Sequence, residues 1–280
     1  GVGFPRESYD QASQLKAVIL PMTGVDKLPL DELARRSVQV GNVHGNARSV
    51  AERAVSLTLA WYGSIMPYHR DLQQGIWHGF WVHRGLKDTW ESVNNKGCVI
   101  LGAGKIGRYI AEMLKPFGVK ITGYRKKRAP LGEPFDHTVF DIDQALEAGE
   151  IVISVLPDTP ETQGVLNKER EVLLSLKESF VLINVGRRSV ADEGDLYEAL
   201  KQGTLRGAAI DCWYRYPEGS DGVYPSAYPF GSLDQVIMSP HIAGYTADAA
   251  ARSISEAFDN LIHFYSTGKL INEVDLLQGY

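Results

Sequence analysis

The stretch VILGAGKIGRYIAEML, residues 99–114, is the clearest indication of the fold in this sequence. An apolar run typical of a strand ends at the pattern Gly-x-Gly-x-x-Gly, and a helix-like pattern starts inside it. In such a turn Gly102 permits the tight bend, Gly104 lets the backbone approach a pyrophosphate, and Gly107 lets the helix lie close to the strand. The start of the helix offers free N–H groups and positive dipole to phosphates. The pattern predicts a dinucleotide site formed by Gly102, Gly104, Lys105, Ile106 and Gly107. A glycine-rich turn without a ligand is the weaker alternative.

From Gly97 onward, short apolar runs alternate with helix-like segments. Near-continuous apolar strands separated by helices predict a parallel sheet that is covered by helices on both faces. The predicted fold class is therefore α/β, with a doubly wound parallel Rossmann sheet. The predicted strands are GCVIL (97–101), KITGY (120–124), IVISVL (151–156), FVLIN (180–184), GAAID (207–211) and QVIMS (235–239).

Outside this region the pattern is less regular. AVIL at 17–20 is typical of a short buried strand. One long helix is predicted over 50–74, because apolar residues recur at helical spacing and no proline occurs before Pro67. A connector rich in Trp and His, at 75–90, shows no clear period. A last helix is predicted over about 246–266.

The composition excludes several classes of protein. The 280 residues are 44% hydrophobic and 22% charged, which is normal for a globular chain with a core. A net charge of -5 argues against a general nucleic-acid binder. Two cysteines form no disulfide framework, so we expect a reducing, cytoplasmic compartment. No apolar run is long enough to span a membrane, and no signal peptide is visible.

A basic cluster, GYRKKRAP at 123–130, stands out in this acidic chain. Proteins that bind NAD place an acidic residue about 20 residues beyond the glycine turn, on the ribose 2′-hydroxyl. Arg125 occupies that place here, followed by Lys126. A guanidinium pairs with a 2′-phosphate, which a carboxylate would repel. The cluster therefore predicts NADP, with NAD still possible. A solvated basic loop is the alternative, and nucleic acid is a distant third.

Seventeen residues separate Gly107 from Arg125. That spacing resembles the hallmark of the D-isomer-specific 2-hydroxyacid dehydrogenases, and the similarity extends well beyond the turn. Four further segments resemble the family's motifs: the substrate loop and following helix (23–52), the segment after the fourth strand of the cofactor domain (156–169), and the segments of the catalytic arginine (184–213) and histidine (238–244).

The resemblance implies two domains. A central dinucleotide-binding domain would span about 74–245, and a flavodoxin-like substrate domain would combine 1–73 with 246–280. The family's usual opening strands and helices are missing from this sequence. We therefore expect an incomplete substrate domain, which is either truncated at Gly1 or reduced in the protein itself. The family usually dimerises through its cofactor domains, so the resemblance also implies a homodimer.

The implied reaction moves a hydride between C4 of nicotinamide and C2 of a small 2-keto acid. Arg187 matches the family's catalytic arginine, whose fork can hold the carboxylate and polarise the carbonyl. His241 matches the general acid, a role suited to a pKa near working pH. Gly24 and Val25 match the loop whose N–H groups hold the substrate carboxylate. The resemblance also implies cofactor contacts for Pro157, Thr159, Val185, Asp211 and His241, with Asp211 and Pro157 near the nicotinamide.

One departure affects the chemistry directly. The family places a glutamate five residues after the position of Asp211, where it orients the histidine and raises its pKa. Tyr216 stands there, and Glu218 lies two residues further on. A phenol can accept or donate a hydrogen bond, but it cannot stabilise an imidazolium as a carboxylate does. Either Tyr216 or Glu218 could serve as the partner of His241.

Other features remain open. Arg188 replaces a glycine that usually follows the catalytic arginine, and it is either a second anion contact or a surface residue. The segment 217–232 is longer than usual and rich in Pro, Gly, Ser and Tyr. His44 could contact substrate or serve a structural role. His78 and His83 have no metal-like neighbours in the sequence, so we expect no metal.

The leading interpretation is an enzyme, an NADP-preferring 2-ketoacid reductase of the glyoxylate, hydroxypyruvate or phosphoglycerate type. The second is a nucleotide-sensing binding protein with weak or no catalysis, which Tyr216 would permit. The retention of both Arg187 and His241 favours the enzyme. A formate or phosphonate-type dehydrogenase is a weaker third interpretation. The expected partners are a small 2-keto or 2-hydroxy acid and a second copy of the chain, without nucleic acid or membrane.

Overall fold

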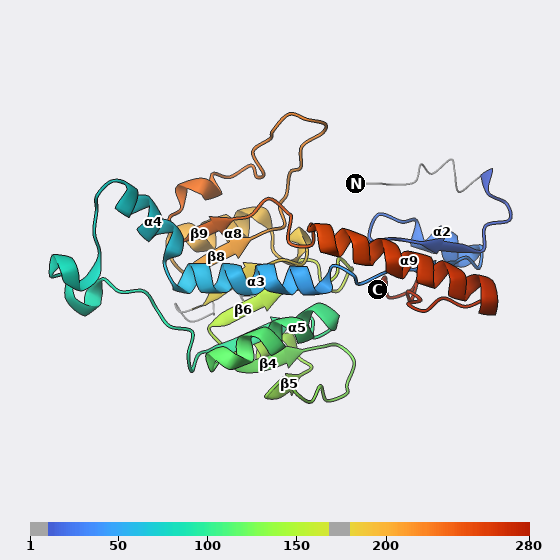
Figure 1. The fold of residues 1–280 in the computed structure, drawn as a ribbon, viewed down its shortest axis with the longest axis horizontal. Coiled ribbons are helices and arrows are strands. Elements are labelled where there is room, and N and C mark those ends of the chain that lie inside the picture. Colours follow the sequence, from blue (N-terminus) through green and yellow to red (C-terminus); the bar gives the residue numbers. More distant parts are fainter. Residues whose placement is uncertain (1–10, 168–179) are drawn as a thin grey trace. The chain divides into compact units, whose positions relative to one another are not determined.

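The centre of the chain forms one parallel sheet (Figure 1). The computed structural model describes residues 11–167 and 180–280. The first ten residues, and the last two of the dehydrogenase-like segment 156–169, lie outside this range. The sheet contains β3 (Gly97–Leu101), β4 (Lys120–Tyr124), β5 (His137–Val139), β6 (Ile151–Ser154), β7 (Val181–Asn184), β8 (Gly207–Ile210) and β9 (Val236–Met238). Their spatial order is β5-β4-β3-β6-β7-β8-β9, and all neighbours are parallel.

All six strands that the sequence predicts in this region are confirmed. One strand was not predicted: β5, which has three residues at one edge of the sheet. None of its side chains is fully buried. Such a short edge strand lacks the apolar run that marks the central strands. The strand order reverses between β3 and β6, which makes the carboxyl ends of these two strands the place where open α/β sheets bind ligands.

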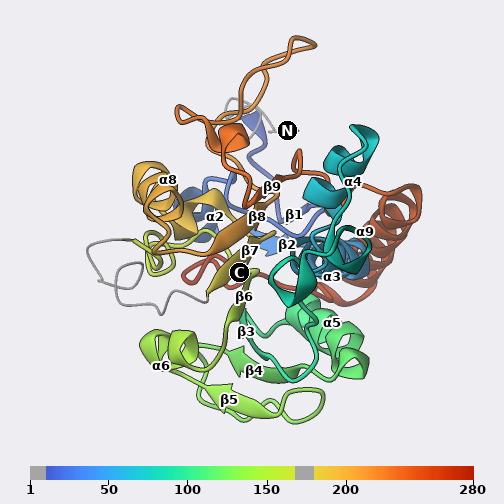
Figure 2. The same ribbon diagram turned by 90° about the vertical axis from the view of Figure 1, so that its left-hand side faces the viewer.

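Helices cover both faces of this sheet (Figure 2). On one face, α3 (Ala47–Tyr62) and α5 (Lys105–Leu114) contribute side chains to an apolar cluster with Ile100, Ile153 and Ile183. On the other face, α6 (Ile142–Glu147) and α8 (Glu193–Gln202) pack with Val152 and Leu182. Successive residues of a strand point to opposite faces, so strands buried on both sides are apolar throughout.

The single helix predicted over 50–74 is wrong, because the structure divides it. After α3 ends at Tyr62, a second helix, α4, covers Ile65–Gln73. Between them Ser64 has a φ of 52°, a left-handed conformation that interrupts the helical hydrogen bonds. This break could not be predicted from the sequence, because apolar residues recur at helical spacing on both sides of it and across it.

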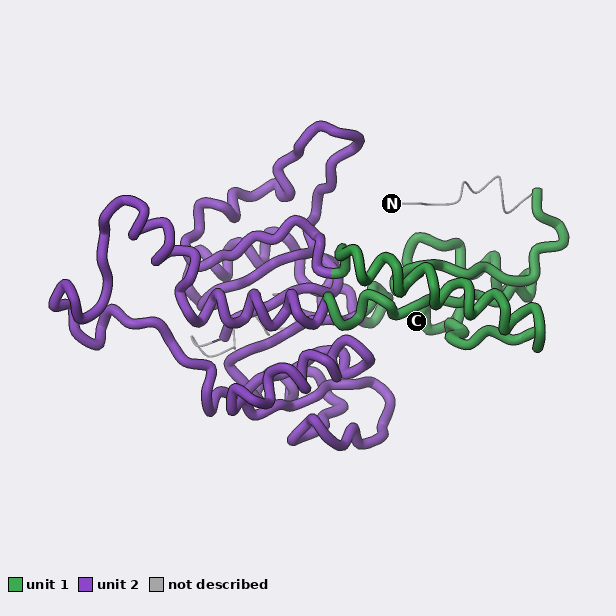
Figure 3. Tube along the Cα trace, viewed as in Figure 1, with its two compact units in different colours: residues 1–49, 157–161, 244–280 green, residues 50–156, 162–243 purple. Residues whose placement is uncertain are grey.

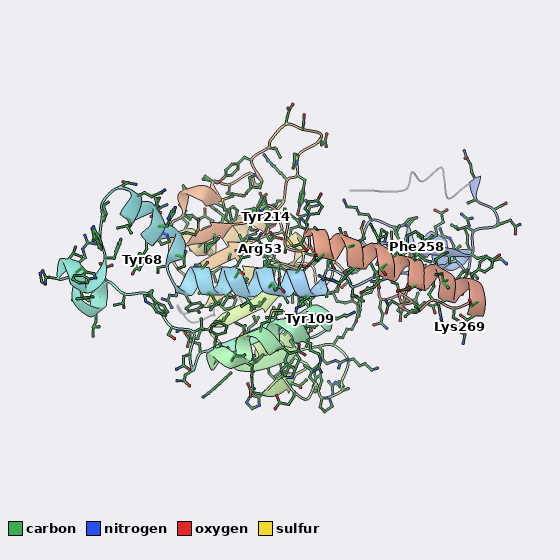
Figure 4. The ribbon with its side chains drawn as sticks, in the orientation of Figure 1. Arg53, Tyr68, Tyr109, Tyr214, Phe258 and Lys269 are labelled. Carbon is green, nitrogen blue, oxygen red and sulfur yellow. The ribbon has the colours of Figure 1, made fainter. Side chains whose placement is uncertain are left out.

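The segment from α4 to Trp90 extends away from the sheet (Figure 1). It contains 3₁₀ turns at Gly79–Val82 and Gly85–Lys87. Tyr68, labelled in Figure 4, lies on it and stacks against His78 with ring centroids 4.4 Å apart. Its apolar side chains are largely exposed, among them Trp77, Phe80, Trp81, Leu86 and Trp90.

The chain divides into two compact units (Figure 3). Val50–Leu156 and Thr162–Ala243 form the unit with the large sheet. Gly1–Ser49, Pro157–Glu161 and Gly244–Tyr280 form the other unit.

The smaller unit has a two-stranded parallel sheet of its own. Its strands are β1 (Ala17–Ile19) and β2 (Gln39–Gly41), with α2 (Leu30–Arg35) between them in sequence. Leu33 of α2 is fully buried in a core with Val25, Val38, Val40 and Val274. The last helix, α9 (Ala247–Thr267), confirms the predicted start, since the Thr246 hydroxyl caps it by accepting the Ala249 N–H. No helix in the described part of the chain could cross a membrane.

Candidate active site

The predicted site residues of the larger unit follow neighbouring strands of one sheet. Gly102 follows β3 and Arg125 follows β4, while Arg187, Asp211 and His241 come after β7, β8 and β9. The last residues of adjacent strands are paired, as in Leu101 with Tyr124 and Asn184 with Ile210. Because the strands are parallel, these side chains all lie at the carboxyl edge of the sheet, where ligands bind in this class of fold.

The glycine turn has the geometry of a phosphate cradle. Gly102 has a φ of 101°, which favours glycine. A Cβ on Gly107 would lie 2.4 Å from the Gly102 carbonyl oxygen and 3.0 Å from Ile100 Cγ2, so this helix residue touches the strand. A Cβ on Gly104 would meet nothing within 4 Å. That open space lies at the first turn of α5, where N–H groups have no helical acceptor. The residues therefore fit the pyrophosphate of a dinucleotide.

The basic loop is tied to this turn through the backbone. The N–H groups of Gly102 and Ala103 both donate to the Tyr124 carbonyl, at 3.2 and 3.0 Å. Arg125, the next residue, is half-buried, and its N–H donates to the Val139 carbonyl at 3.2 Å. In the described residues no carboxylate lies within ion-pair distance of the Arg125 guanidinium. The loop thus places a cation beside the glycine turn, with Lys126 exposed next to it.

Hydrogen bonds from the neighbouring strand ends fix the turn that carries Arg187. The Asn184 side chain donates to the Arg187 carbonyl at 3.0 Å and accepts the Gly186 N–H at 3.2 Å. The Gly186 carbonyl accepts from Arg187 Nη1 and from the Cys212 thiol, each at 3.0 Å. Burial, aided by the Asp211 charge and opposed by Arg187, raises the pKa of Cys212 to about 12. The thiol therefore stays protonated and remains a donor near neutral pH.

Asp211 is fully buried, and its carboxylate holds the turn that carries His241. It accepts the Ser239 hydroxyl and the N–H groups of Ile242 and Ala243, the last two at 3.2 and 3.0 Å. His241, between Ser239 and Ile242 in the sequence, has a φ of 56°. A residue other than glycine is strained in this conformation and needs the surrounding hydrogen bonds to hold it. The predicted contact of Asp211 with nicotinamide stays a prediction.

Tyr216 lies beside His241, with its hydroxyl oxygen 2.5 Å from His241 Nδ1. The same hydroxyl accepts the Trp213 N–H at 3.1 Å, and the Trp213 ring donates to the Ser239 carbonyl at 2.7 Å. Burial is the main cause of a raised pKa at Tyr216, so its phenol stays protonated near neutral pH. The positive charges of Arg188 and Arg187 lower the pKa of Tyr216 and so partly offset the effect of burial.

Glu218, the other candidate partner, is exposed and borders an open pocket of about 520 Å³ with Arg215, Asp221 and Val223. Within the described residues it makes no hydrogen bond or ion pair with His241. The long segment 217–232 is anchored instead through Ser226 and Ala227, which donate to Glu193 at 2.6 and 2.7 Å.

The predicted substrate loop lies in the smaller unit. Val25 is buried in that unit's core, and Gly24 precedes it. Neither N–H donates to any acceptor in residues 11–167 and 180–280. Asn42 donates to the Thr23 carbonyl at 2.8 Å, which fixes the loop.

Three other predicted residues lie in the same unit. Pro157 is half-buried and Thr159 is buried. The N–H of His44 donates to Glu256 at 2.8 Å, which ties that segment to α9. Val185, in the larger unit, is buried directly after β7.

Three residues of the site carry no signal in the sequence, because their roles depend on contacts between strand ends: Asn184, Cys212 and Ser239. Across the described ranges, no group of three or more His, Cys, Asp and Glu side chains could hold a metal ion.

A glycine turn, a nearby cation, an arginine and a histidine at one edge of a parallel sheet are typical of nicotinamide-dependent oxidoreductases. The chain belongs to the D-isomer-specific 2-hydroxyacid dehydrogenases, since residues 55–243 match the NAD-binding domain of that family. Glyoxylate reductase of Thermofilum pendens is 32% identical over 259 residues, which cover 91% of this chain and 74% of that protein. Formate dehydrogenase of Candida boidinii is 30% identical over 274 residues, covering 94% and 72%.

A solved structure is similar over nearly the whole chain. It is the NADPH-dependent glyoxylate/hydroxypyruvate reductase of Sinorhizobium meliloti in complex with NADP and malonate. The TM-score is 0.80 at 27% identity, and the match covers 98% of this chain and 82% of that one.

Proposed function

We propose that this protein is an NADP-preferring reductase that transfers a hydride to C2 of a small 2-keto acid to form the D-hydroxy acid. The observation that carries the proposal is the set of Arg187, His241 and Tyr216 at the carboxyl edge that also holds the glycine turn. NADPH, when bound, supplies the hydride. Lys105 and Ile106 would offer N–H groups to its pyrophosphate, while Arg125 and Lys126 would pair with its 2′-phosphate.

Arg187 would bind the substrate carboxylate and polarise the carbonyl through its planar fork. His241 would give the proton that the new hydroxyl needs, from Nε2, because Nδ1 faces Tyr216. A phenol can form a hydrogen bond with the His241 ring in both of its protonation states. It accepts from Nδ1–H of the imidazolium, and it donates to Nδ1 of the neutral ring. A carboxylate would favour the imidazolium alone. We therefore propose reduction that is fastest at a lower pH than a carboxylate partner would give.

We propose that Gly24 and Val25 bind the carboxylate through their N–H groups. The smaller unit would be part of a flavodoxin-like substrate domain, for which we propose limits near residues 1–73 and 246–280, and the dinucleotide domain would cover about 74–245. The smaller unit has two parallel strands, β1 and β2, with α2 between them in sequence, and this arrangement supports the assignment. We also propose a homodimer in which the exposed apolar side chains of the segment from α4 to Trp90 are covered by the second copy.

The proposal is tested by NADPH consumption with a panel of 2-keto acids, including glyoxylate and hydroxypyruvate. We expect kcat/KM for NADPH to exceed that for NADH by about tenfold or more. Arg125→Asp should lower kcat/KM with NADPH by about 10–100-fold, because a charge-assisted hydrogen bond contributes about 1.5–3 kcal/mol. The same variant assayed with NADH is the control and should change little. Equal use of both cofactors by the wild type would contradict the NADP assignment.

A nucleotide-sensing protein is the second candidate, and Tyr216 in place of a carboxylate favours it. Calorimetric binding of NADPH separates the two, because a sensor binds the cofactor tightly without turning over any keto acid between about pH 5 and 8. Formate oxidation with NADP, measured in the same panel, tests the third interpretation.

A further inference from the structure

Arg188 connects the turn of Arg187 to the segment that carries Tyr216. Its Nη1 donates to the Tyr214 carbonyl oxygen at 2.6 Å. The guanidinium itself is exposed, so this contact is made at the surface of the larger unit. Tyr214 is two residues from Tyr216, and Arg188 directly follows Arg187. The hydrogen bond therefore ties the carboxyl end of β7 to the segment that follows β8.

The segment 211–216 is held at several other points. The Tyr214 hydroxyl donates to the Ala191 carbonyl at 3.0 Å (Tyr214 is labelled in Figure 4). The N–H groups of Tyr214 and Arg215 donate to the Pro225 carbonyl at 3.2 and 2.9 Å. These bonds fix the middle of the segment. Tyr216 comes after the last of them, and its own hydroxyl meets only Trp213 and His241 within the described residues.

The position of the Tyr216 hydroxyl thus depends on the path of the backbone at Tyr214. The Tyr214 carbonyl and the Arg215 N–H belong to one peptide unit, which Arg188 holds at one end and the Pro225 carbonyl holds at the other. Without the Arg188 contact only the Pro225 bond would hold this unit, so the unit could tilt and move the phenol. Because the Tyr216–His241 contact is 2.5 Å, a shift of about 1 Å would remove that hydrogen bond.

We propose that Arg188 is a positioning residue for the proton donor of the reaction: by holding the Tyr214 carbonyl, it keeps the Tyr216 hydroxyl on Nδ1 of His241. This rests on the proposed function, in which His241 gives the proton. The role differs from a second anion contact for the substrate, because Arg188 would act through Tyr216 rather than by contacting the substrate itself.

The first test does not require turnover. Histidine-selective ¹⁵N spectra report which ring nitrogen of His241 carries hydrogen, and His241→Asn identifies its signals. We expect Arg188→Ala to give the His241 signals of Tyr216→Phe, and Arg188→Lys, which keeps one N–H donor, to retain those of the wild type. Wild-type signals in Arg188→Ala would overturn the proposal. A Tm close to that of the wild type, measured for each variant, shows that the fold is intact.

The second test is a double-mutant cycle on keto-acid reduction. We expect Arg188→Ala to lower kcat about three- to tenfold with KM for the keto acid within about twofold, as for one lost hydrogen bond. In the Tyr216→Phe background the same change should leave kcat within about twofold. An equal loss in both backgrounds, or a KM about tenfold higher in both, would overturn the positioning role. A wild type that reduces no keto acid would refute the proposed function, while the ¹⁵N spectra still decide the role of Arg188.

Discussion

Replacing Gly107 by alanine is expected to destabilise the fold, whereas the same change at Gly104 should weaken only cofactor binding. An alanine Cβ at 107 would lie 2.4 Å from the Gly102 carbonyl oxygen. Ordinary C···O contacts are about 3.3–3.6 Å, so α5 must move by about 1 Å. Ile100 Cγ2, at 3.0 Å, blocks relaxation toward the strand. Such overpacking costs about 1–3 kcal/mol.

This cost can be measured as a thermal shift without cofactor. At roughly 3 °C per kcal/mol for a chain of this size, Gly107→Ala should lower Tm by about 3–9 °C. Gly104 is the matched control in the same turn. Its φ is -83°, a value that alanine adopts, and the added Cβ would meet nothing within 4 Å. We expect Tm of Gly104→Ala to stay within about 2 °C of the wild type.

NADPH titration completes the comparison. If Gly104 leaves space for a pyrophosphate, its new methyl group should raise Kd for NADPH about tenfold or more, which corresponds to about 1.4 kcal/mol. A wild-type Kd in Gly104→Ala would refute the placement of the pyrophosphate at this glycine. A wild-type Tm in Gly107→Ala would refute the argument that the helix has no room to move.

Two further perturbations test side chains that the fold places under constraint. Both ring nitrogens of His78 face carboxylate oxygens, of Asp88 at 2.8 Å and Asp71 at 2.9 Å, so the ring must be an imidazolium to donate to both. The hydrogen bond with Asp88, then that with Asp71, raises the pKa of His78. The protonated His78 ring therefore stabilises the fold fully below the pKa of about 6.5 that His78 has in the unfolded chain. This stabilisation is lost as pH rises through the higher pKa that His78 has in the folded protein. Denaturant unfolding from pH 6 to 9 should show the loss of stability on His78→Gln shrinking as pH rises, and a pH-independent difference would contradict the imidazolium. His69→Gln, on the preceding helix α4, is the control. Asp211→Asn should lower the free energy of unfolding by about 2–4 kcal/mol, because an amide nitrogen would face one of three buried donors; a loss below about 0.5 kcal/mol in urea melts would show that the carboxylate does not hold the His241 turn.

The sheet and the glycine turn were predictable because their signals are local. Each central strand is a short apolar run, and the turn needs glycine at fixed spacings. The break at Ser64 was not predictable in the same way. The apolar pattern continues through it, and a left-handed serine has no sequence signature comparable to glycine. The edge strand β5 was missed because its side chains are not buried enough to require an apolar run.

Local sequence pattern is enough to predict the α/β alternation, the dinucleotide turn and the positions of Arg187, Asp211 and His241 at strand ends, since backbone geometry and burial act on neighbouring residues. The folded chain was needed to show that Tyr216 rather than Glu218 lies against His241, and that Asp211 supports the His241 turn. These contacts join the ends of β8 and β9, which are 25 or more residues apart in the chain. Which side chains meet there depends on strand register and on the path of a loop, and neither can be read from local pattern.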